Sequence, residues 1–349
     1  MNKRIAKVSF FAIVLVVFIH AYNANLVVDN QAVKGTSPLV WFIESLIGDG
    51  FARVAVPLFF FISGIRFYYG IDGRFDTVVY RNKLLKRSIS VAGPFVKWST
   101  LGMAIVFLLQ TIPFSAPFFN SMLLRDMSIR KLLSIWILDP LPYQLWFMQV
   151  LFCMAVLSPL FWRLIQLKLP TFFIVTGCLV LWYFKGGYNG WPEYFFEGMA
   201  FFMLGAVVSI RQIDIMQYRG HWLLLMLWAT LVVAKIWLIF VHQPSLALVT
   251  GKLSIMIGMV AVWSMIDGWQ SGSRYFEILL SQTFFIYLSH EPLLTITKKL
   301  LLSDFSPLQG RLLIVYFMAP VLSIAVCLMS GWILKAYVPR LHSWLTGGR

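Results

Sequence analysis

An imidazole lies inside one of the most apolar stretches of this sequence. The segment VSFFAIVLVVFIHAYNANL, Val8–Leu26, is almost uniformly hydrophobic until it reaches His20. Histidine is the side chain that most often transfers protons in catalysis, and it can also carry a covalent group. An ionisable side chain among apolar neighbours is costly to keep, so His20 is a candidate functional residue. The alternative is that His20 only hydrogen-bonds to a neighbouring helix.

A second histidine stands in a similar environment, next to a carboxylate. The string FFIYLSHEPLL, Phe284–Leu294, holds His290 and Glu291 side by side. Adjacent residues on a helix point in different directions, so these two side chains cannot simply form a dyad with each other. We expect each to face a partner on another helix, with His20 as one candidate. We also expect Pro292 to bend the helix at this point.

The elements that must position these residues are membrane helices. Of the 349 residues, 60% are hydrophobic and only 12% are charged, whereas soluble domains carry about 25% charged residues. Apolar segments of roughly 20 residues, long enough to cross ~30 Å of hydrocarbon, recur along the whole chain. No stretch is polar enough for a separate soluble domain. We therefore predict an all-α polytopic integral membrane protein in which residues 1–349 form a single transmembrane domain.

The hydropathy pattern fits about ten transmembrane helices, of which the fifth is short. The predicted spans are 8–28, 51–70, 91–112, 145–165, 171–184, 194–210, 221–241, 248–267, 276–297 and 311–334. The N-terminal run lacks a clear cleavage site and many spans follow it, so we expect an uncleaved first helix rather than a signal peptide.

Basic residues favour an orientation with both termini in the cytoplasm. The cytoplasmic side would then hold Lys3, Arg4, Lys7, Arg81, Lys83, Lys86, Arg87, Lys335, Arg340 and Arg349, among others. The opposite side would hold fewer, chiefly Lys34, Arg125, Arg130, Lys131, Lys185, Lys298 and Lys299. This loop bias accounts for the net charge of +15 without a nucleic-acid partner. His20, about 18 Å along its helix from Val8, would lie beyond the midplane towards the outer face, and so would His290.

Five strings, in order along the chain, carry a resemblance to a known family. They are VVFIHA (16–21), RVAVPLFFFISGI (53–65), YRNKLLKRSISVAGPF (80–95), PYQLWFMQVLFCMAVLSPL (142–160) and FFIYLSHEPLL (284–294). Each string is a weak signal because apolar helix packing produces similar patterns. In this order they resemble the membrane acyltransferase-3 family, which includes bacterial O-acetyltransferases of surface glycans. The resemblance covers nearly the whole chain.

The resemblance implies acyl transfer from cytoplasmic acyl-CoA to a hydroxyl presented at the far side of the membrane. A neutral imidazole at His20 can take the hydroxyl proton during attack on the thioester, or the acyl group can pass through an acyl-histidine. The sequence leaves both routes open. The family pattern places an arginine eleven residues before this histidine, where this chain has Ser9. Eleven residues make about three helical turns, so Ser9 shares the face of His20 but supplies no charge.

The other site residues also come with alternatives. Arg53, expected at the outer end of the second span, would stabilise an oxyanion or orient the acceptor; otherwise it anchors the helix at the headgroups. Trp146 would line the acceptor cleft or belong to the aromatic belt. His290 and Glu291 would support the acceptor side.

The basic cluster at the start of the third span would meet the phosphates of the donor. Cationic side chains suit phosphate recognition, although basic residues here also follow the positive-inside rule. The predicted acyl-CoA-binding residues are Arg81, Lys83, Lys86 and Arg87.

Three lysines near or within the spans need partners that the spacing does not assign. Lys97, Lys235 and Lys252 each require an acid, a carbonyl or water, and Glu193 and Glu197 are possible partners.

The sequence leads to a multi-pass O-acyltransferase of the bacterial inner membrane. Acetyl-CoA is the expected donor substrate, and succinyl or another short acyl group fits equally. The partners would be the lipid bilayer, acyl-CoA and a glycan or lipid-linked sugar. The cysteines form no metal-binding pattern, and we expect neither a metal nor a tightly bound cofactor. The rival is a transporter or flippase for a glycan or its lipid-linked precursor, although the paired interrupted segments of many transporters are not visible.

Overall fold

The computed structural model describes residues 2–22, 27–28, 31–32, 37–71, 75–113, 123–167, 170–186, 190–215, 222–266, 274–303 and 309–348. Its elements in chain order are α1 (Asn2–Ala21), β1 (Val27–Val28), β2 (Gln31–Ala32), α2 (Pro38–Glu44), η2 (Ser45–Gly50), η3 (Phe51–Val54), α3 (Ala55–Tyr68), α4 (Thr77–Arg87), η4 (Ser88–Ala92), α5 (Gly93–Thr111), η6 (Leu124–Asp126), α6 (Ile129–Ile137), η7 (Tyr143–Leu145), α7 (Trp146–Gln166), α8 (Thr171–Lys185), α9 (Trp191–Ile210), α10 (Trp222–Phe240), α11 (Pro244–Met265), α12 (Arg274–Ser281), α13 (Thr283–Ser303), α14 (Gln309–Tyr337) and α15 (Pro339–Thr346). Strands β1 and β2 form one short antiparallel pair.

The protein is an all-α polytopic membrane protein. Among the described residues, eight helical segments are long and apolar enough to cross a membrane. They are Lys3–Ala21, Pro38–Tyr68, Thr77–Thr111, Tyr143–Gln166, Trp191–Ile210, Trp222–Phe240, Pro244–Met265 and Leu312–Tyr337. Each overlaps one predicted span. The two remaining predicted spans correspond to the short α8 and to α12 with α13, which are separate helices.

The second span begins thirteen residues earlier than the sequence analysis placed it. We expected residues 51–70, whereas helical structure runs from Pro38 to Tyr68 through α2, η2, η3 and α3. Arg53 therefore lies inside a long helical segment and not at its end. The polar residues Glu44 and Asp49 lower the local hydropathy here, which is why the apolar pattern alone missed the first half.

This long segment is not a regular α-helix throughout. Ser45–Gly50 is π-helical and Phe51–Val54 is 3₁₀-helical, so α3 starts afresh at Ala55. Pro57 lies in the first turn of α3. Proline is tolerated there because the N–H groups of a first helical turn make no hydrogen bond within the helix, so the N–H that proline lacks is not needed. Irregular turns of this kind inside helices often occur at functional sites.

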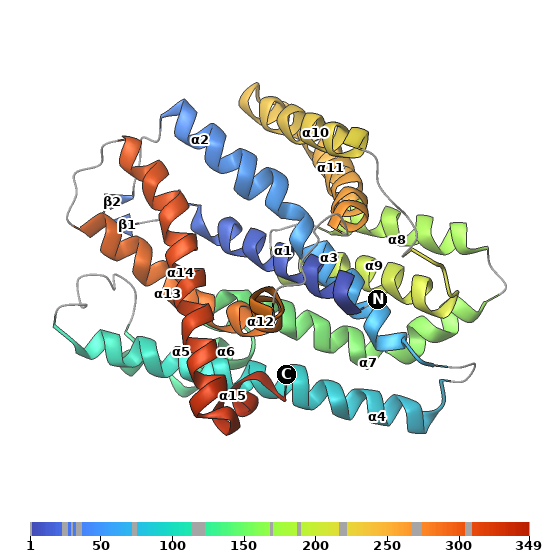
Figure 1. Ribbon diagram of the computed structural model, residues 1–349, viewed down its shortest axis with the longest axis horizontal. Coiled ribbons are helices and arrows are strands. Elements are labelled where there is room, and N and C mark those ends of the chain that lie inside the picture. The colour runs from blue at the N-terminus through green and yellow to red at the C-terminus, as the bar shows by residue number, and fades with distance from the viewer. Residues whose placement is uncertain are drawn as a thin grey trace.

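α1 occupies the middle of the molecule (Figure 1) and contacts α3, α13 and α14. α10 and α11 form one edge of the structure, and α4 and α5 form the opposite edge (Figure 1). The closest helix pair is α3 with α9, where a Cβ at Gly64 would strike the backbone of Phe202 and a Cβ at Gly205 would strike the backbone of Phe61. Small residues that let helix backbones meet are typical of membrane interfaces.

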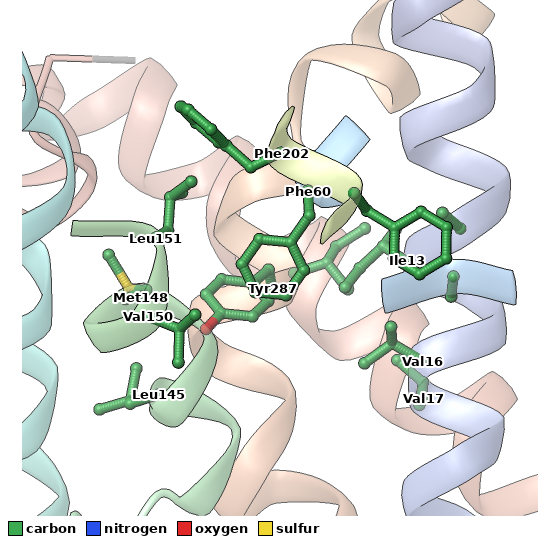
Figure 2. Packing of buried hydrophobic residues seen from close by; sticks show 14 of the residues in the cluster. Ile13, Val16, Val17, Phe60, Leu145, Met148, Val150, Leu151, Phe202 and Tyr287 are labelled. Atoms are coloured by element: carbon green, nitrogen blue, oxygen red, sulfur yellow. The ribbon is translucent and has the colours of Figure 1, made fainter. Parts of the chain in front are cut away.

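The core lies where α1, α3, α7, α9 and α13 converge. Figure 2 shows Ile13 and Val16 of α1, Met148 of α7 and Phe202 of α9 around Tyr287 of α13. These side chains are buried. The central position of α1 means that a polar residue on it meets other helices instead of lipid.

Both chain ends lie at the same end of the bundle. Lys3 in the first turn of α1 forms an exposed ion pair with Glu277 of α12, 3.9 Å apart. α15 packs nearby, with the ring of His342 stacked on Phe285 at a centroid distance of 5.6 Å. This agrees with an even number of crossings, and the cytoplasmic location of the two termini stays a prediction. Lys34 and Arg349, used in the orientation argument, lie outside the described residues.

Candidate active site

His20 lies in the last turn of α1 and faces two aromatic rings. Its imidazole stacks on His290 of α13, with centroids 5.4 Å apart and planes at 22°. Tyr143 of η7 meets the same imidazole edge-on at 4.7 Å. Lys298 Nζ donates to the backbone carbonyl of His20 at 2.9 Å, which satisfies one of the open carbonyls at the helix end. Three residues from two other elements, α13 and η7, therefore fix the surroundings of this histidine.

The hydrogen bonds of His290 define its tautomer. Its Nδ1 lies 3.0 Å from the carbonyl oxygen of Ile286 and 2.9 Å from that of Tyr287. Carbonyl oxygens only accept, so in the neutral ring Nδ1 carries the proton and Nε2 carries the lone pair. Nε2 is buried, and no donor among the described residues reaches it. His290 thus places a free basic nitrogen beside His20.

The kink in α13 explains how His290 and Glu291 point to different helices. Glu291 has non-helical angles (φ −104°, ψ 132°), immediately before Pro292. Proline has no N–H, so the carbonyl of Leu288 four residues earlier loses its helical donor. Gln144 supplies a replacement, because its Nε2 donates to Leu288 O at 3.4 Å and to Glu291 O at 3.3 Å. The bend expected at Pro292 is confirmed.

The carboxylate of Glu291 turns towards η7. Tyr143 donates its hydroxyl hydrogen to Oε1 at 3.2 Å, and Thr295 donates to Oε2 at 2.9 Å. Glu291 itself is buried. Since the ring of Tyr143 also meets His20, the carboxylate orients the wall against which the histidine packs.

His20 lines a cavity of about 610 Å³, which we call the histidine cavity. Residues of α1, η3, α3, α7, α9, α13 and the 138–144 segment form its wall, among them His20, Arg53, Tyr143, Trp146, Tyr194 and Glu197. Trp146 and Tyr194 stack on each other in this wall, with centroids 4.0 Å apart and planes at 20°. The cavity combines a flat aromatic surface with cationic, anionic and imidazole groups.

Arg53 is held in this wall by a carboxylate one turn earlier. Its Nε donates to Asp49 Oδ1 at 2.9 Å, and Lys235 Nζ of α10 donates to the other oxygen, Oδ2, at 2.8 Å. Lys235 also donates to the backbone carbonyl of Asp49 at 2.6 Å. Asp49 therefore bridges two cations and restricts the direction in which Arg53 points. This geometry does not match a headgroup anchor at the end of a helix.

A second carboxylate in the wall, Glu197, is buried and bound from behind. Trp182 Nε1 donates to its Oε2 at 3.0 Å. Lys252 lies over the ring of Trp182, 4.1 Å from its centroid, and donates to Gly186 O at 2.7 Å. The structure thus assigns partners to the three lysines that the spacing left open. Lys235 pairs with Asp49, and Lys97 donates to the backbone carbonyl of Trp344. Lys252 donates to the carbonyl of Gly186 and lies near the charge of Glu197.

A second cavity of about 570 Å³ opens towards the end of the bundle that holds both termini. We call it the basic cavity; Arg66 of α3 and Lys83, Lys86 and Arg87 of α4 line it together with Ser9 of α1. Three of the four predicted donor-binding residues thus gather in one place. Arg81, the fourth, is exposed and is not part of this wall.

The chain was then compared with known proteins. A family model described as "Acyltransferase domain" matches residues 10–332, which is most of the sequence. The chain belongs to the acyltransferase-3 family. No curated protein and no solved structure matches it.

For an acyltransferase-3 protein, the position of Ser9 is informative. Arg4 and Lys7 are the nearest cations to Ser9 along α1, but neither lines the basic cavity. Arg4 Nη1 instead donates to Ile215 O at 3.2 Å. The cations that share the cavity with Ser9 come from α3 and α4.

Sequence reasoning singled out only part of this acyltransferase site. Tyr143 and Gln144 belong to the quoted string PYQLW, of which we named only Trp146. Glu197 was visible as an intramembrane acid, and such residues are functional candidates by default. Arg66 had no signal of its own, since it ends a long apolar helix where a positive-inside residue is ordinary.

Proposed function

We propose that this acyltransferase moves a short acyl group, acetyl or one of similar size, from cytoplasmic acyl-CoA to a hydroxyl of a cell-surface or lipid-linked glycan. The acceptor would enter from the outer side of a bacterial inner membrane. The observation that carries the proposal is the position of His20 on the wall of the histidine cavity, stacked on a second imidazole, with a four-cation cavity at the other end of the same helix.

In the chemical step the acceptor oxygen attacks the thioester carbonyl carbon. His20 takes the hydroxyl proton, the carbon–sulfur bond breaks, and the departing CoA thiolate takes up that proton. A positioned general base typically contributes 10²–10⁴-fold in rate. An acyl-histidine is the alternative route: His20 first accepts the acyl group as CoA leaves, and the hydroxyl then displaces the histidine.

Arg53 has the geometry to act on the same centre. Asp49 directs its guanidinium in the wall of the histidine cavity, and a guanidinium carries five N–H donors. Those donors would stabilise the negative charge that develops on the carbonyl oxygen or bind an acceptor hydroxyl.

The remaining wall of the histidine cavity suits a sugar. The stacked Trp146 and Tyr194 offer a flat apolar surface for one face of a pyranose ring, and Glu197 offers acceptor oxygens to its hydroxyls. A few polar groups on a mainly apolar wall are typical of small-molecule sites. On the other side, Arg66, Lys83, Lys86 and Arg87 would bind the phosphates of the donor.

The test is direct. The purified protein in lipid vesicles receives radiolabelled acetyl-CoA, and release of free thiol is measured with and without an extract of lipid-linked glycans. In parallel, surface glycans from cells with and without the protein are compared by mass spectrometry. We expect thiol release that depends on the acceptor and an acyl mass difference on one sugar. Glycan movement across the vesicle membrane without thiol release would favour the transporter instead.

A further inference from the structure

The histidine cavity and the basic cavity share part of their walls. Phe59 of α3, Phe147 of α7 and Tyr287 of α13 line both cavities, and among the described residues no other side chain does. Along α1, Ser9 lines one cavity and His20 the other, eleven residues or about 16 Å apart. Three aromatic rings therefore stand between the proposed donor site and the proposed acceptor site.

Phe147 is the central ring of this set. Its centroid lies 5.9 Å from that of Phe59 and 5.7 Å from that of Tyr287, and both pairs meet edge to face. Phe60, behind it in α3, lies closer at 4.5 Å. Phe147 therefore touches the ring on either side of it.

The three rings differ in how firmly they are held. Tyr287 is buried, and its hydroxyl donates to the backbone carbonyl of Gln144 at 2.8 Å. It also stacks on Phe284 at 6.0 Å. Phe59 and Phe147 are only half-buried and have no polar group to tie them. Tyr287 is thus a fixed wall, whereas a side-chain rotation of Phe147 needs no hydrogen bond to break.

We infer that Phe59, Phe147 and Tyr287 close a passage between the two cavities, and that Phe147 limits the size of the acyl group that the enzyme transfers. The inference rests on the proposed function, because it assumes an acyl thioester entering from the basic cavity. A short acyl group passes beside Phe147 to reach His20, and each added methylene meets the ring. The closed apolar rings also prevent water in the basic cavity from reaching the thioester carbonyl.

The first experiment measures the passage without using enzyme activity. Cys153, Cys178 and Cys327 are replaced by alanine, and Val56→Cys places one thiol on the wall of the histidine cavity. A membrane-impermeant anionic thiol reagent, which the cations of the basic cavity attract, is added from the basic-cavity side of oriented vesicles. Modification should be slow with Phe147 present and at least tenfold faster with Phe147→Ala. Phe152→Ala, on the same helix but lining neither cavity, is the matched control.

The second experiment measures acyl preference. Thiol release from acetyl-, butyryl- and hexanoyl-CoA is compared in the parent, Phe147→Leu, Phe147→Ala and Phe152→Ala. One methylene in an apolar pocket typically changes discrimination by about 10–200-fold. We therefore expect the butyryl-to-acetyl ratio to rise about tenfold or more in Phe147→Ala, less in Phe147→Leu, and not at all in the control. The leucine variant keeps most of the apolar volume and covers the case in which alanine impairs folding.

The outcomes separate the inference from the function on which it rests. Unchanged thiol modification in both Phe147 variants overturns the passage, whatever the activity. Faster modification with an unchanged acyl ratio overturns Phe147 as the size-limiting residue. If the parent releases no thiol from any donor, the proposed function fails, and the modification rates still decide whether the rings close a passage.

Discussion

The two cavities are built in opposite ways. Around the histidine cavity the chain is irregular: a π-helical turn precedes Arg53, Arg53 itself lies in a 3₁₀ turn, and α13 kinks at Glu291. Around the basic cavity, the regular helix α4 projects its cations from successive turns, and the π-helical turn η4 begins only after the last of them, Arg87. Irregular backbone inside a membrane protein survives where side chains satisfy the freed groups, as Gln144 does for Leu288.

Their charged groups differ in the same way. At the histidine cavity, Asp49 holds Arg53 of the wall by a hydrogen bond one turn away, and the hydroxyls of Tyr143 and Thr295 hold Glu291 behind Tyr143. In the basic cavity, Lys86 is exposed and Lys83 donates to the carbonyl of Tyr69 at 3.0 Å. The first arrangement fixes directions, which suits bond making and breaking. The second gathers four positive charges along one wall, which suits a flexible polyanion.

The largest effect is expected at the centre of the fixed region. His20→Gln keeps hydrogen bonding but removes the base, so transfer should fall by about 10²–10⁴-fold while the donor KM changes little. The measurement is acceptor-dependent thiol release at matched membrane abundance. His242→Asn is the control, because His242 is exposed and has a positive φ of 56°, which asparagine tolerates.

If the His20→Gln variant keeps its activity, the histidine cavity is not the place where bonds are made and broken, and the contrast between the two cavities fails. Activity near the parent level in His20→Gln would mean that this histidine only packs between helices. His290→Gln would then be the variant to examine, since the free Nε2 of His290 is the other basic nitrogen at this place.

The second largest loss of transfer activity is expected for Asp49→Asn. This variant tests whether the direction of the Arg53 guanidinium matters for transfer. The amide keeps the size of the side chain but removes the charge that binds Arg53 and Lys235. Losing a hydrogen bond between charged groups costs about 1.5–3 kcal/mol, so transfer should fall roughly tenfold or more. Acceptor KM or kcat should change, and donor KM should not.

The control for Asp49→Asn is Glu193→Gln, a half-buried carboxylate that lines neither cavity. Equal losses in donor and acceptor kinetics would indicate general damage to the fold, and Asp49 would then be a structural residue only. A thermal-unfolding measurement in detergent separates these cases.

The double change Lys86→Gln with Arg87→Gln tests the basic cavity. Removing two of its cations should raise the donor KM about tenfold with kcat little changed, and added salt should weaken donor binding in the parent more than in the variant. Arg130→Gln with Lys131→Gln removes the same charges from exposed positions on α6 and serves as the control. An unchanged donor KM would leave Lys86 and Arg87 with a role in topology alone.

Arg81→Gln should have the smallest effect. Its side chain is exposed and does not line the basic cavity, so the donor KM should stay within about a factor of two of the parent value. This variant sharpens the comparison because the sequence grouped Arg81 with Lys83, Lys86 and Arg87. A tenfold rise in donor KM would extend the donor site beyond the cavity wall.

The sequence by itself determined the class of protein, its family and the first candidate residue. Hydropathy is a local property of the chain, so the apolar runs identified the membrane helices even where their ends were misplaced. The strings around His20, Arg53 and His290 indicated the acyltransferase-3 family because their residue types and order are legible without coordinates.

Tertiary structure decided which of these residues meet. The stacking of His290 on His20 depends on a kink and on the rotation of α13 about its axis, and packing against α1 and η7 sets both. The binding of Arg53 by Asp49 depends on an irregular turn, which the spacing of apolar residues in the sequence does not predict. The backbone hydrogen bonds of a membrane helix form within that helix, so each helix can be predicted from its own residues. Contacts between side chains of different helices follow only from how the helices assemble.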